Sequence, residues 1–200
     1  MVAQRGLRSW LAEAERIDHA VYAAVAGTST PLFDAAMRRL SRAANYSRLS
    51  IASSVVLATA CGPSGRRAAR AGLASVAATS AFVNLIIKPV GHRRRPNRSL
   101  EGVPLARQVR MPTSASFPSG HTAAAVAFAS AAGRVLPAAG VPLHSLAALV
   151  AYSRVHTGVH YPGDVIAGAL LGAVIADLTG GAINRSRVKR TGRHSSASIS

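Results

Sequence analysis

The feature that most constrains the fold is a series of five segments that are apolar on every helical face. Between residues 49 and 180 the only acidic residues are Glu101, Asp164 and Asp177. The five segments cover approximately residues 49–62, 71–87, 119–139, 143–156 and 163–180. A helix without a polar face is buried in a large core or in a membrane. The sequence therefore predicts an all-α, polytopic membrane bundle with five transmembrane helices.

Three details of these segments concern how they cross the membrane, where they turn and how they pack. A membrane span needs about 20 residues, so the shorter segments must extend into their polar flanks in order to cross. The first two segments are separated by basic residues at 66, 67 and 70, which predicts a turn there. Small residues such as Gly168 and Gly172, four apart, permit close contact between helices.

The residues before and after the apolar segments have a different pattern. In residues 7–26, apolar side chains from Leu7 to Val25 recur at helical spacing, with charged side chains elsewhere on the helix. Residues 32–46 repeat this pattern, with Asp34 on the charged face. Residues 1–48 are therefore predicted to form amphipathic helices at the membrane interface, although two helices of a soluble bundle would show the same pattern. Residues 49–180 form the membrane domain, and the basic, serine-rich residues 181–200 are predicted to be a disordered tail.

The charge of the chain points to a polyanionic partner. The formal net charge is +17 and the isoelectric point is near 11.8, which suits either nucleic acid or anionic lipid. Interleaved aromatic residues and a soluble nucleic-acid-binding motif are absent from the sequence, so no nucleic-acid partner is expected. The single cysteine, Cys61, cannot form an internal disulfide. A cleaved secretion signal is not expected at the N-terminus.

Residues suited to phosphate chemistry gather in three blocks, each where a polar loop meets an apolar segment. The blocks are Lys88 with Arg95-Pro96, then Pro118-Ser119-Gly120-His121, then Ser153-Arg154 followed by His160 and Asp164. Together they supply three cations, two imidazoles and one carboxylate. Such a set can hold a phosphate, attack it with a histidine and protonate the leaving group. With five spans, all three blocks fall on the same face of the membrane.

Each block also has a purely structural interpretation. A Ser-Gly sequence is common at the start of a helix, where Ser116 is expected as the N-cap. Free backbone N–H groups at such a start nevertheless form a cradle for an anion. Cations near a membrane interface often extend toward lipid headgroups, and this interpretation is preferred for Arg93, Arg94 and Arg98. Arg154, by contrast, is costly in so apolar a segment unless it is paired or faces a polar cavity.

The spacing Lys-x6-Arg-Pro, Pro-Ser-Gly-His and Ser-Arg-x5-His-x3-Asp resembles the signature of the type 2 phosphatidic acid phosphatase superfamily. The resemblance covers about residues 50 to 180. It implies that His160 is the nucleophile, that Asp164 orients it, and that His121 is the general acid. It further implies that phosphate is bound by five residues, namely Lys88, Arg95, Arg154, Ser119 and Gly120. A phosphohistidine intermediate and the absence of any metal or cofactor also follow from it. The superfamily usually has six spans, so here the first is missing or is replaced by residues 7–26.

The function expected from the resemblance is hydrolysis of a lipid phosphate, such as phosphatidic acid or a polyprenyl phosphate or diphosphate. Two alternatives are a vanadium-dependent haloperoxidase, which shares the pocket, and a non-catalytic lipid-binding membrane protein. A metal site at His121, His156, His160 and Asp164 is disfavoured because the neighbouring cations would repel a divalent ion. The expected location is the bacterial inner membrane, with the active site on the outer side, although basic residues are nearly balanced between the two faces. The sequence does not indicate an oligomeric state.

Overall fold

The structure, a computed structural model, describes the backbone of residues 2–196 and the side chains of residues 9–181. Within the described residues the secondary structure is entirely helical. The main helices are α1 (Val2–Gly27), α2 (Pro31–Ala43), α3 (Arg48–Ala60), α4 (Gly62–Phe82), α5 (Lys88–Val90), α6 (Gly120–Val135), α7 (Gly140–His156) and α8 (Pro162–Ser196). Short turns of other helix types occur at η1 (Asn45–Ser47), η2 (Val83–Ile87), η3 (Leu105–Arg107) and η4 (Pro137–Ala139).

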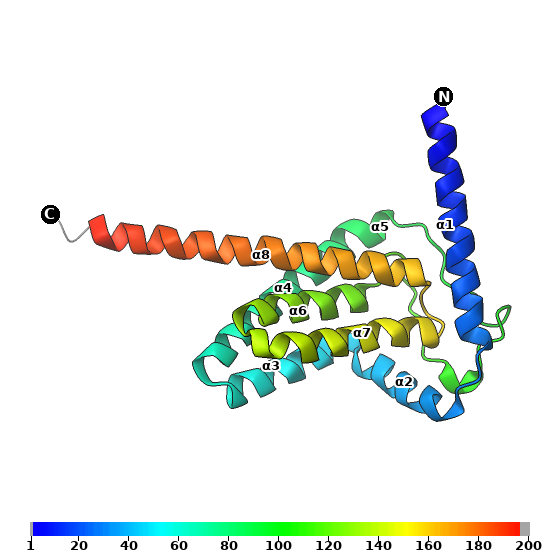
Figure 1. Ribbon diagram of the computed structural model, residues 1–200, viewed down its shortest axis with the longest axis horizontal. Helices are drawn as coiled ribbons and strands as arrows, with labels where there is room; N and C mark the ends of the chain where they lie inside the picture. Colours follow the sequence, from blue (N-terminus) through cyan, green and yellow to red (C-terminus); the bar gives the residue numbers. More distant parts are fainter. Residues whose placement is uncertain (1, 197–200) are drawn as a thin grey trace.

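Helices α3, α4, α6, α7 and α8 form the bundle and correspond to the five predicted apolar segments. Helix α6 lies inside it and packs against α4, α7 and α8 (Figure 1). Because consecutive helices run in opposite directions, the chain returns to the same end of the bundle after α5 and after α7. The three blocks therefore meet at one end, as the topology implied.

Small residues set the spacing of these helices. A Cβ atom built on Gly168 would lie 2.5 Å from the carbonyl oxygen of Ser119, and one built on Gly172 would collide with the carbonyl oxygen of Ala123. The backbone of α8 is thus in direct contact with that of α6, which confirms the packing role predicted for the two glycines. On the other side of α6, Gly72 of α4 packs against the ring of Phe128.

The turn predicted at residues 66–70 is wrong. The chain reverses earlier, at Gly62, whose positive φ of 56° suits glycine, and Pro63 begins the next helix. The three arginines at 66, 67 and 70 therefore lie in the first turns of α4. Gly65 permits this tight reversal because it packs directly on the backbone of Leu57.

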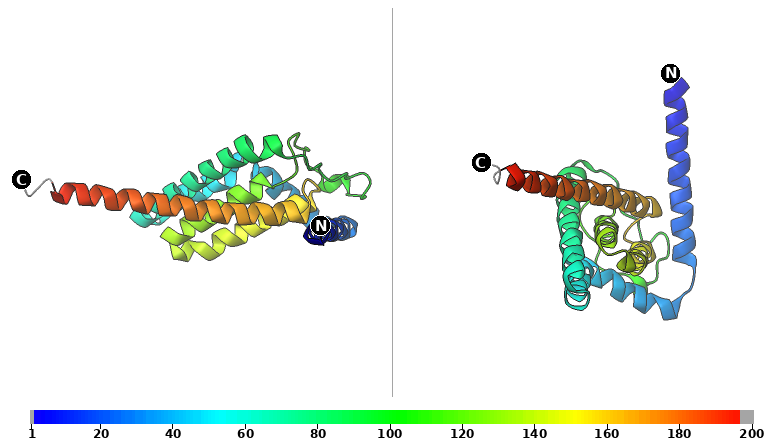
Figure 2. Two further views of the ribbon diagram at one scale, coloured as in Figure 1. Left: turned by 90° about the horizontal axis from the view of Figure 1, so that it is seen from above. Right: turned by 60° about the vertical axis from the view of Figure 1, so that its left-hand side comes forward.

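Helices α1 and α2 lie at the end of the bundle that carries the three blocks, and α1 runs across the bundle rather than along it (Figures 1 and 2). Tyr22 and Ala26 of α1 are buried against Val155. Trp10 is 74% exposed and Ile17 is 59% exposed. An apolar face of α1 is thus left exposed by the described residues, and its location at a membrane interface stays a prediction.

Two of the described helical segments are long and apolar enough to cross a membrane, namely Gly62–Val90 and Pro162–Gly181. Helices α3, α6 and α7 have 13, 16 and 17 residues. The prediction of five spans therefore remains a prediction. The backbone of α8 is helical as far as Ser196. The side chains of the predicted basic tail lie outside the described residues, so its disorder also stays a prediction.

Candidate active site

The first and third blocks meet around Arg95. Its Nη1 atom lies 3.3 Å from Nε2 of His160 and donates to the carbonyl oxygen of Val159 at 2.8 Å. The Nε atom of Arg95 donates to the carbonyl oxygen of Ser114 at 2.9 Å, and Nζ of Lys88 donates to the hydroxyl of the same serine at 3.1 Å. Lys88 and Arg95 are thus held together through Ser114. Burial lowers the pKa of Arg95, which still remains a permanent cation at neutral pH.

The second block joins the third through the backbone. The N–H of Ser119 donates to the carbonyl oxygen of Asp164 at 2.8 Å, so the start of α6 lies beside the start of α8. Gly120 follows, and a Cβ atom built there would lie 3.8 Å from Nζ of Lys88. Ser119 itself is the residue before α6, and its hydroxyl accepts a hydrogen bond from Thr122 at 3.0 Å. The three blocks therefore form one cluster.

His160 and Asp164 form a buried pair. Nδ1 of His160 lies 3.3 Å from Oδ2 of Asp164, and the two residues are 1% and 0% exposed. With the proton on Nδ1 shared with the carboxylate, the lone pair is on Nε2, the nitrogen that faces Arg95. Burial lowers the pKa of His160 to about 4, although the hydrogen bond with Asp164 opposes this shift. The imidazole is therefore neutral at physiological pH, which a nucleophile requires.

The carboxylate of Asp164 is fixed by further donors. Oδ2 accepts from the hydroxyl of Ser116 at 2.5 Å and from the N–H of Tyr161 at 3.0 Å. Ser116 was predicted to be the N-cap of the helix after Pro118. That prediction is wrong, because α6 begins at Gly120 and the side chain of Ser116 is used by Asp164.

Arg154 lies in the last turn of α7 and is 1% exposed. Its Nη1 atom donates to the hydroxyl and the carbonyl oxygen of Ser41 in α2, at 2.7 and 3.1 Å. Its Nε atom is buried and has no hydrogen-bond partner among the described residues. A buried donor without a partner is costly, so Arg154 is well suited to an anionic ligand that supplies the missing acceptor.

His121 faces open space in the first turn of α6. Its Nε2 atom lies 3.0 Å from Oδ1 of Asn45. It lines two cavities, of about 220 Å³ beside Lys88 and Gly120, and of about 640 Å³ beside Arg154. His121 is thus available to a ligand from both sides, whereas His160 is buried next to it in the cluster.

Sequence analysis missed the role of Arg93. This residue was expected to extend toward lipid headgroups, and that prediction is wrong. Its Nη1 atom donates to Oδ1 of Asp164 at 2.6 Å, and its Nη2 atom forms an ion pair with Asp18 of α1. Although burial alone would lower the pKa of Arg93, the hydrogen bond to Asp18 and the charge of Asp164 raise it. Asp18 also accepts from the N–H of Gly163 at 2.6 Å. The N-terminal helix is therefore connected to the buried His160–Asp164 pair.

A second missed network involves Asp34 of α2, which was placed on a charged outer face but is 6% exposed. Its Oδ1 atom accepts from Nε of Arg107 at 2.8 Å and lies 3.0 Å from Nε2 of His156. Burial alone would raise the pKa of Asp34, but the hydrogen bond from Thr30 and the charge of Arg107 bring it below its usual value. His156 is thus directed away from His160. Within the described side chains, no group of three or more His, Cys, Asp and Glu residues could hold a metal ion.

Of the other two arginines that were predicted to extend toward lipid headgroups, Arg98 donates to the carbonyl oxygen of Val109 at 2.7 Å and stabilises the long loop instead of facing lipid. Arg94 is exposed, and its contact with lipid headgroups stays a prediction. Neither residue reaches the His160–Asp164 pair through a hydrogen bond or ion pair. Among the three arginines predicted to face outward, the contact with Asp164 therefore belongs to Arg93.

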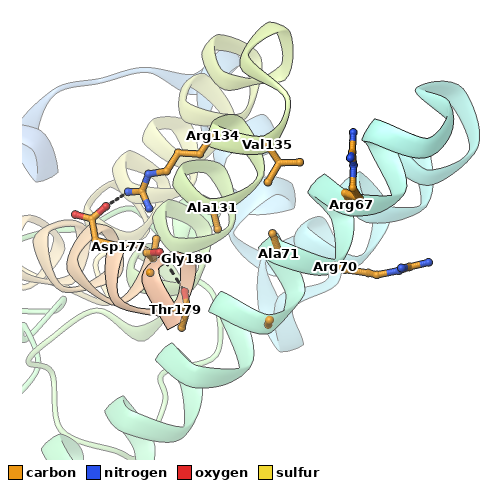
Figure 3. Close-up of a pocket in the computed structure, with 12 residues that line it drawn as sticks. Arg67, Arg70, Ala71, Ala131, Arg134, Val135, Asp177, Thr179 and Gly180 are labelled. Atoms are coloured by element: carbon orange, nitrogen blue, oxygen red, sulfur yellow. Dashed lines mark hydrogen bonds and ion pairs between the residues drawn. The ribbon is translucent and has the colours of Figure 1, made fainter. Parts of the chain in front are cut away.

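A cavity larger than either of the two beside His121 lies elsewhere. It has a volume of about 850 Å³ and lies between α4, α6 and α8 at the opposite end of the bundle (Figure 3). Its walls include Ala71, Ala131 and Thr179, and the side chain of Arg134 points to Asp177 and pairs with it. No imidazole is among the described residues that line this cavity, so the site is located by its chemistry and not by cavity size.

Comparison with known proteins decides the family. The sequence model of the PAP2 superfamily matches residues 70–186, a range that contains all three blocks. The chain belongs to the PAP2 superfamily. The match excludes α1 and α2, although both helices contribute side chains to the cluster described above.

The chain is similar in sequence to two phosphatases with different names. The decaprenylphosphoryl-5-phosphoribose phosphatase of Mycobacterium tuberculosis is 39% identical over 123 residues, which cover 56% of this chain and 64% of the relative. The lipid A 1-phosphatase of Rhizobium johnstonii is 42% identical over 64 residues, which cover 32% of this chain and 26% of the relative. The chain thus spans less than two thirds of the length of either.

Two crystal structures share the PAP2 fold of this chain. One is a transmembrane phosphatidylglycerolphosphate phosphatase from Bacillus subtilis, with 23% identity, a TM-score of 0.65, and coverage of 86% of this chain and 87% of that one. The other is LpxE from Aquifex aeolicus, with 24% identity, a TM-score of 0.63, and coverage of 80% and 92%. At this identity the likeness shows the fold. The all-helical bundle predicted from sequence is thus confirmed as that of the PAP2 membrane phosphatases.

Proposed function

We propose that the protein is an integral membrane phosphatase that removes a terminal phosphate from a lipid through a phosphohistidine. The observation that carries this proposal is the position of Nε2 of His160, 3.3 Å from Nη1 of Arg95, while Nδ1 faces Asp164. A neutral imidazole whose free lone pair faces a phosphate-binding cation is arranged for attack on phosphorus.

In the first step the phosphoryl group is bound by Lys88, Arg95 and Arg154, with Ser119 and the N–H of Gly120 at the start of α6. These donors stabilise the charge that develops on the equatorial oxygens. Nε2 of His160 attacks, the N–P bond forms, and the bond from phosphorus to the leaving oxygen breaks. His121 gives its proton to that oxygen. An anion bound in front of His121 favours the protonated form that this step requires.

In the second step the neutral His121 takes a proton from water, and the resulting hydroxide attacks phosphorus. The N–P bond breaks, inorganic phosphate leaves, and His160 regains its lone pair. His121 ends the cycle protonated, as it began. The chemistry requires no metal, because the cations perform the charge stabilisation that a metal would supply.

Arg93 and Asp18 are proposed as positioning residues. Asp164 holds the tautomer of His160, and Arg93 holds Asp164 through Oδ1 at 2.6 Å. Asp18 in turn holds Arg93 and the N–H of Gly163. A fixed carboxylate keeps Nε2 directed to phosphorus through both steps.

The proposed substrate is a polyprenyl or glycerolipid phosphate or diphosphate. The names of the relatives, which include phosphatases of decaprenylphosphoryl-phosphoribose and of lipid A, support a lipid substrate. They also favour a phosphatase over a haloperoxidase. A non-catalytic lipid-binding protein would need the cations but not the His160–Asp164 pair.

The bundle is proposed to cross the bacterial inner membrane five times, with the active site on the outer face. Helices α1 and α2 would then lie along the surface, where the exposed side chains of Trp10 and Ile17 enter the bilayer. The long apolar segments Gly62–Val90 and Pro162–Gly181 support membrane residence.

The test is phosphate release by purified full-length protein from a panel of lipid phosphates, with a chelator present. The panel consists of phosphatidic acid, a polyprenyl monophosphate, a polyprenyl diphosphate and a polyprenylphosphoryl sugar phosphate. We expect turnover of at least one substrate, and its loss in His160→Ala but not in His92→Ala, an exposed histidine of the loop that carries Arg95. Failure of the wild-type protein to release phosphate from any of them would contradict the proposal.

A further inference from the structure

The cavity of about 640 Å³ beside His121 has a strongly positive lining. Three arginines line it, Arg42, Arg110 and Arg154, together with neutral residues that include Asn45 and Ser114. No aspartate or glutamate is among its lining residues. Its volume is in the usual range for a site that binds a small molecule.

Arg42 and Arg110 have no role in the cluster around His160. Arg42 comes from α2, and Arg110 from the long loop after η3. Both are exposed, and neither forms an ion pair with a carboxylate among the described side chains. Two cations without a carboxylate partner, in the lining of the cavity that also contains Arg154 and His121, suit an anionic occupant.

The arginines show which end of this cavity is buried and which end is open to solvent. Arg154 is 1% exposed and has a buried Nε atom without a partner in the part of the chain that the structure describes, whereas Arg42 and Arg110 lie at the surface. His121, the proposed donor of the proton to the leaving oxygen, lines the same cavity. The cavity therefore extends from the position of the transferred phosphoryl group to solvent, along the side on which the leaving group departs.

We propose that Arg42 and Arg110 bind a second phosphate group, carried by the leaving part of the substrate. The proposal rests on the proposed function and narrows its substrate class. The substrate then has a terminal phosphate that is hydrolysed and a second anionic phosphorus centre, either as a diphosphate or as a phosphodiester between a sugar phosphate and a polyprenol. A lipid with one phosphate, such as phosphatidic acid, lacks the group that these two arginines would bind.

The test compares three substrates in neutral detergent, namely phosphatidic acid, a polyprenyl diphosphate and a polyprenylphosphoryl sugar phosphate. The variant is the double substitution Arg42→Gln with Arg110→Gln. Arg39→Gln is the matched control, because Arg39 is exposed on the same helix but does not line the cavity. We expect the double variant to lose about tenfold or more in kcat/KM on at least one substrate with a second phosphate. Its kcat/KM on phosphatidic acid should change less than about threefold, the size expected for loss of a surface charge.

Salt and added lipid distinguish the sources of the anion. If the substrate's own phosphate is bound, raising the ionic strength weakens wild-type activity on the preferred substrate more than it weakens the double variant. If the arginines bind bulk anionic lipid instead, the variant loses activity equally on all three substrates and loses any stimulation by added phosphatidylglycerol. That result, or an unchanged kcat/KM on every substrate, overturns the second-phosphate site while phosphate release still supports the enzyme. Absence of phosphate release by the wild-type protein overturns both.

Discussion

Replacing Arg93 by glutamine tests whether the N-terminal helix helps to position the reacting histidine. The substitution removes the donor at 2.6 Å from Oδ1 of Asp164 and the partner of Asp18, while a hydrogen-bonding amide remains. Asp164 is fully buried, and the side chain of Arg93 is 27% exposed. The carboxylate would keep its hydrogen bonds from Ser116 and Tyr161, so its orientation would loosen without being lost.

The size of the effect follows from these contacts. A hydrogen bond between charged groups contributes about 1.5–3 kcal/mol, and partial exposure of Arg93 and the remaining donors reduce this to about 1–2 kcal/mol. If that free energy is lost from the transition state, kcat/KM falls by about fivefold to thirtyfold. Removal of a positive charge also favours the protonated form of His160, so its pKa rises from about 4.

The assay is the pH dependence of kcat/KM on the best substrate, whose acidic limb reports the free enzyme. Attack requires neutral His160, so activity rises as pH increases through the pKa of this residue. We expect the acidic limb of Arg93→Gln to lie at higher pH than that of the wild type. Arg93→Lys retains the charge and should keep the limb close to its original position.

The matched control is Arg94→Gln, because Arg94 is exposed in the same loop and should tolerate the change. A fall in activity with an unmoved acidic limb would mean that Arg93 only stabilises the fold. Wild-type activity in Arg93→Gln would refute the positioning role altogether.

Three further predictions concern packing, stability and metal independence. Gly168→Ala places a methyl group against the backbone of Ser119, so we expect a loss of about 1–3 kcal/mol in stability and lower phosphate release, measured by thermal unfolding in detergent and by turnover. The control is Gly27→Ala, because a Cβ atom at Gly27 would contact no other atom, so the added methyl group should cause no steric clash. Asp34→Ala leaves the fully buried Arg107 without its carboxylate, which should cost about 3–5 kcal/mol of unfolding free energy, with a smaller cost for Asp34→Asn. Removal of divalent ions by a chelator should leave kcat unchanged, and restoration of activity only by an added metal would contradict the mechanism.

The bundle was predictable because its helices are apolar on every face. Such segments have few alternatives, and the order of five antiparallel helices brings residues 88–95, 121 and 160–164 to one end. Convergence of the three blocks therefore followed from the topology alone. The boundary at Gly62 was missed because arginines were taken to mark a turn, although the adjacent Gly62 and Pro63 carried the stronger signal.

The participation of the N-terminal helices was not predictable in the same way. Asp18 and Asp34 look like members of a solvated face, since an amphipathic pattern says nothing of a partner distant in sequence. Their partners Arg93 and Arg107 lie more than 70 residues away along the chain. The scarcity of carboxylates could have predicted these ion pairs. A chain with 24 basic and 7 acidic residues has few carboxylates with which to neutralise a buried arginine.

The central claim is that the nitrogen of His160 becomes bonded to phosphorus. The most direct measurement is to mix the purified protein with a substrate labelled in its terminal phosphate, quench in alkali within milliseconds to seconds, and map the label by mass spectrometry. We predict an acid-labile phosphohistidine at residue 160, which accumulates in His121→Ala because its release to water is slowed, and which is absent from His160→Ala. Steady phosphate release by the wild-type protein with the label on another residue, or undiminished release by His160→Ala, would contradict the account.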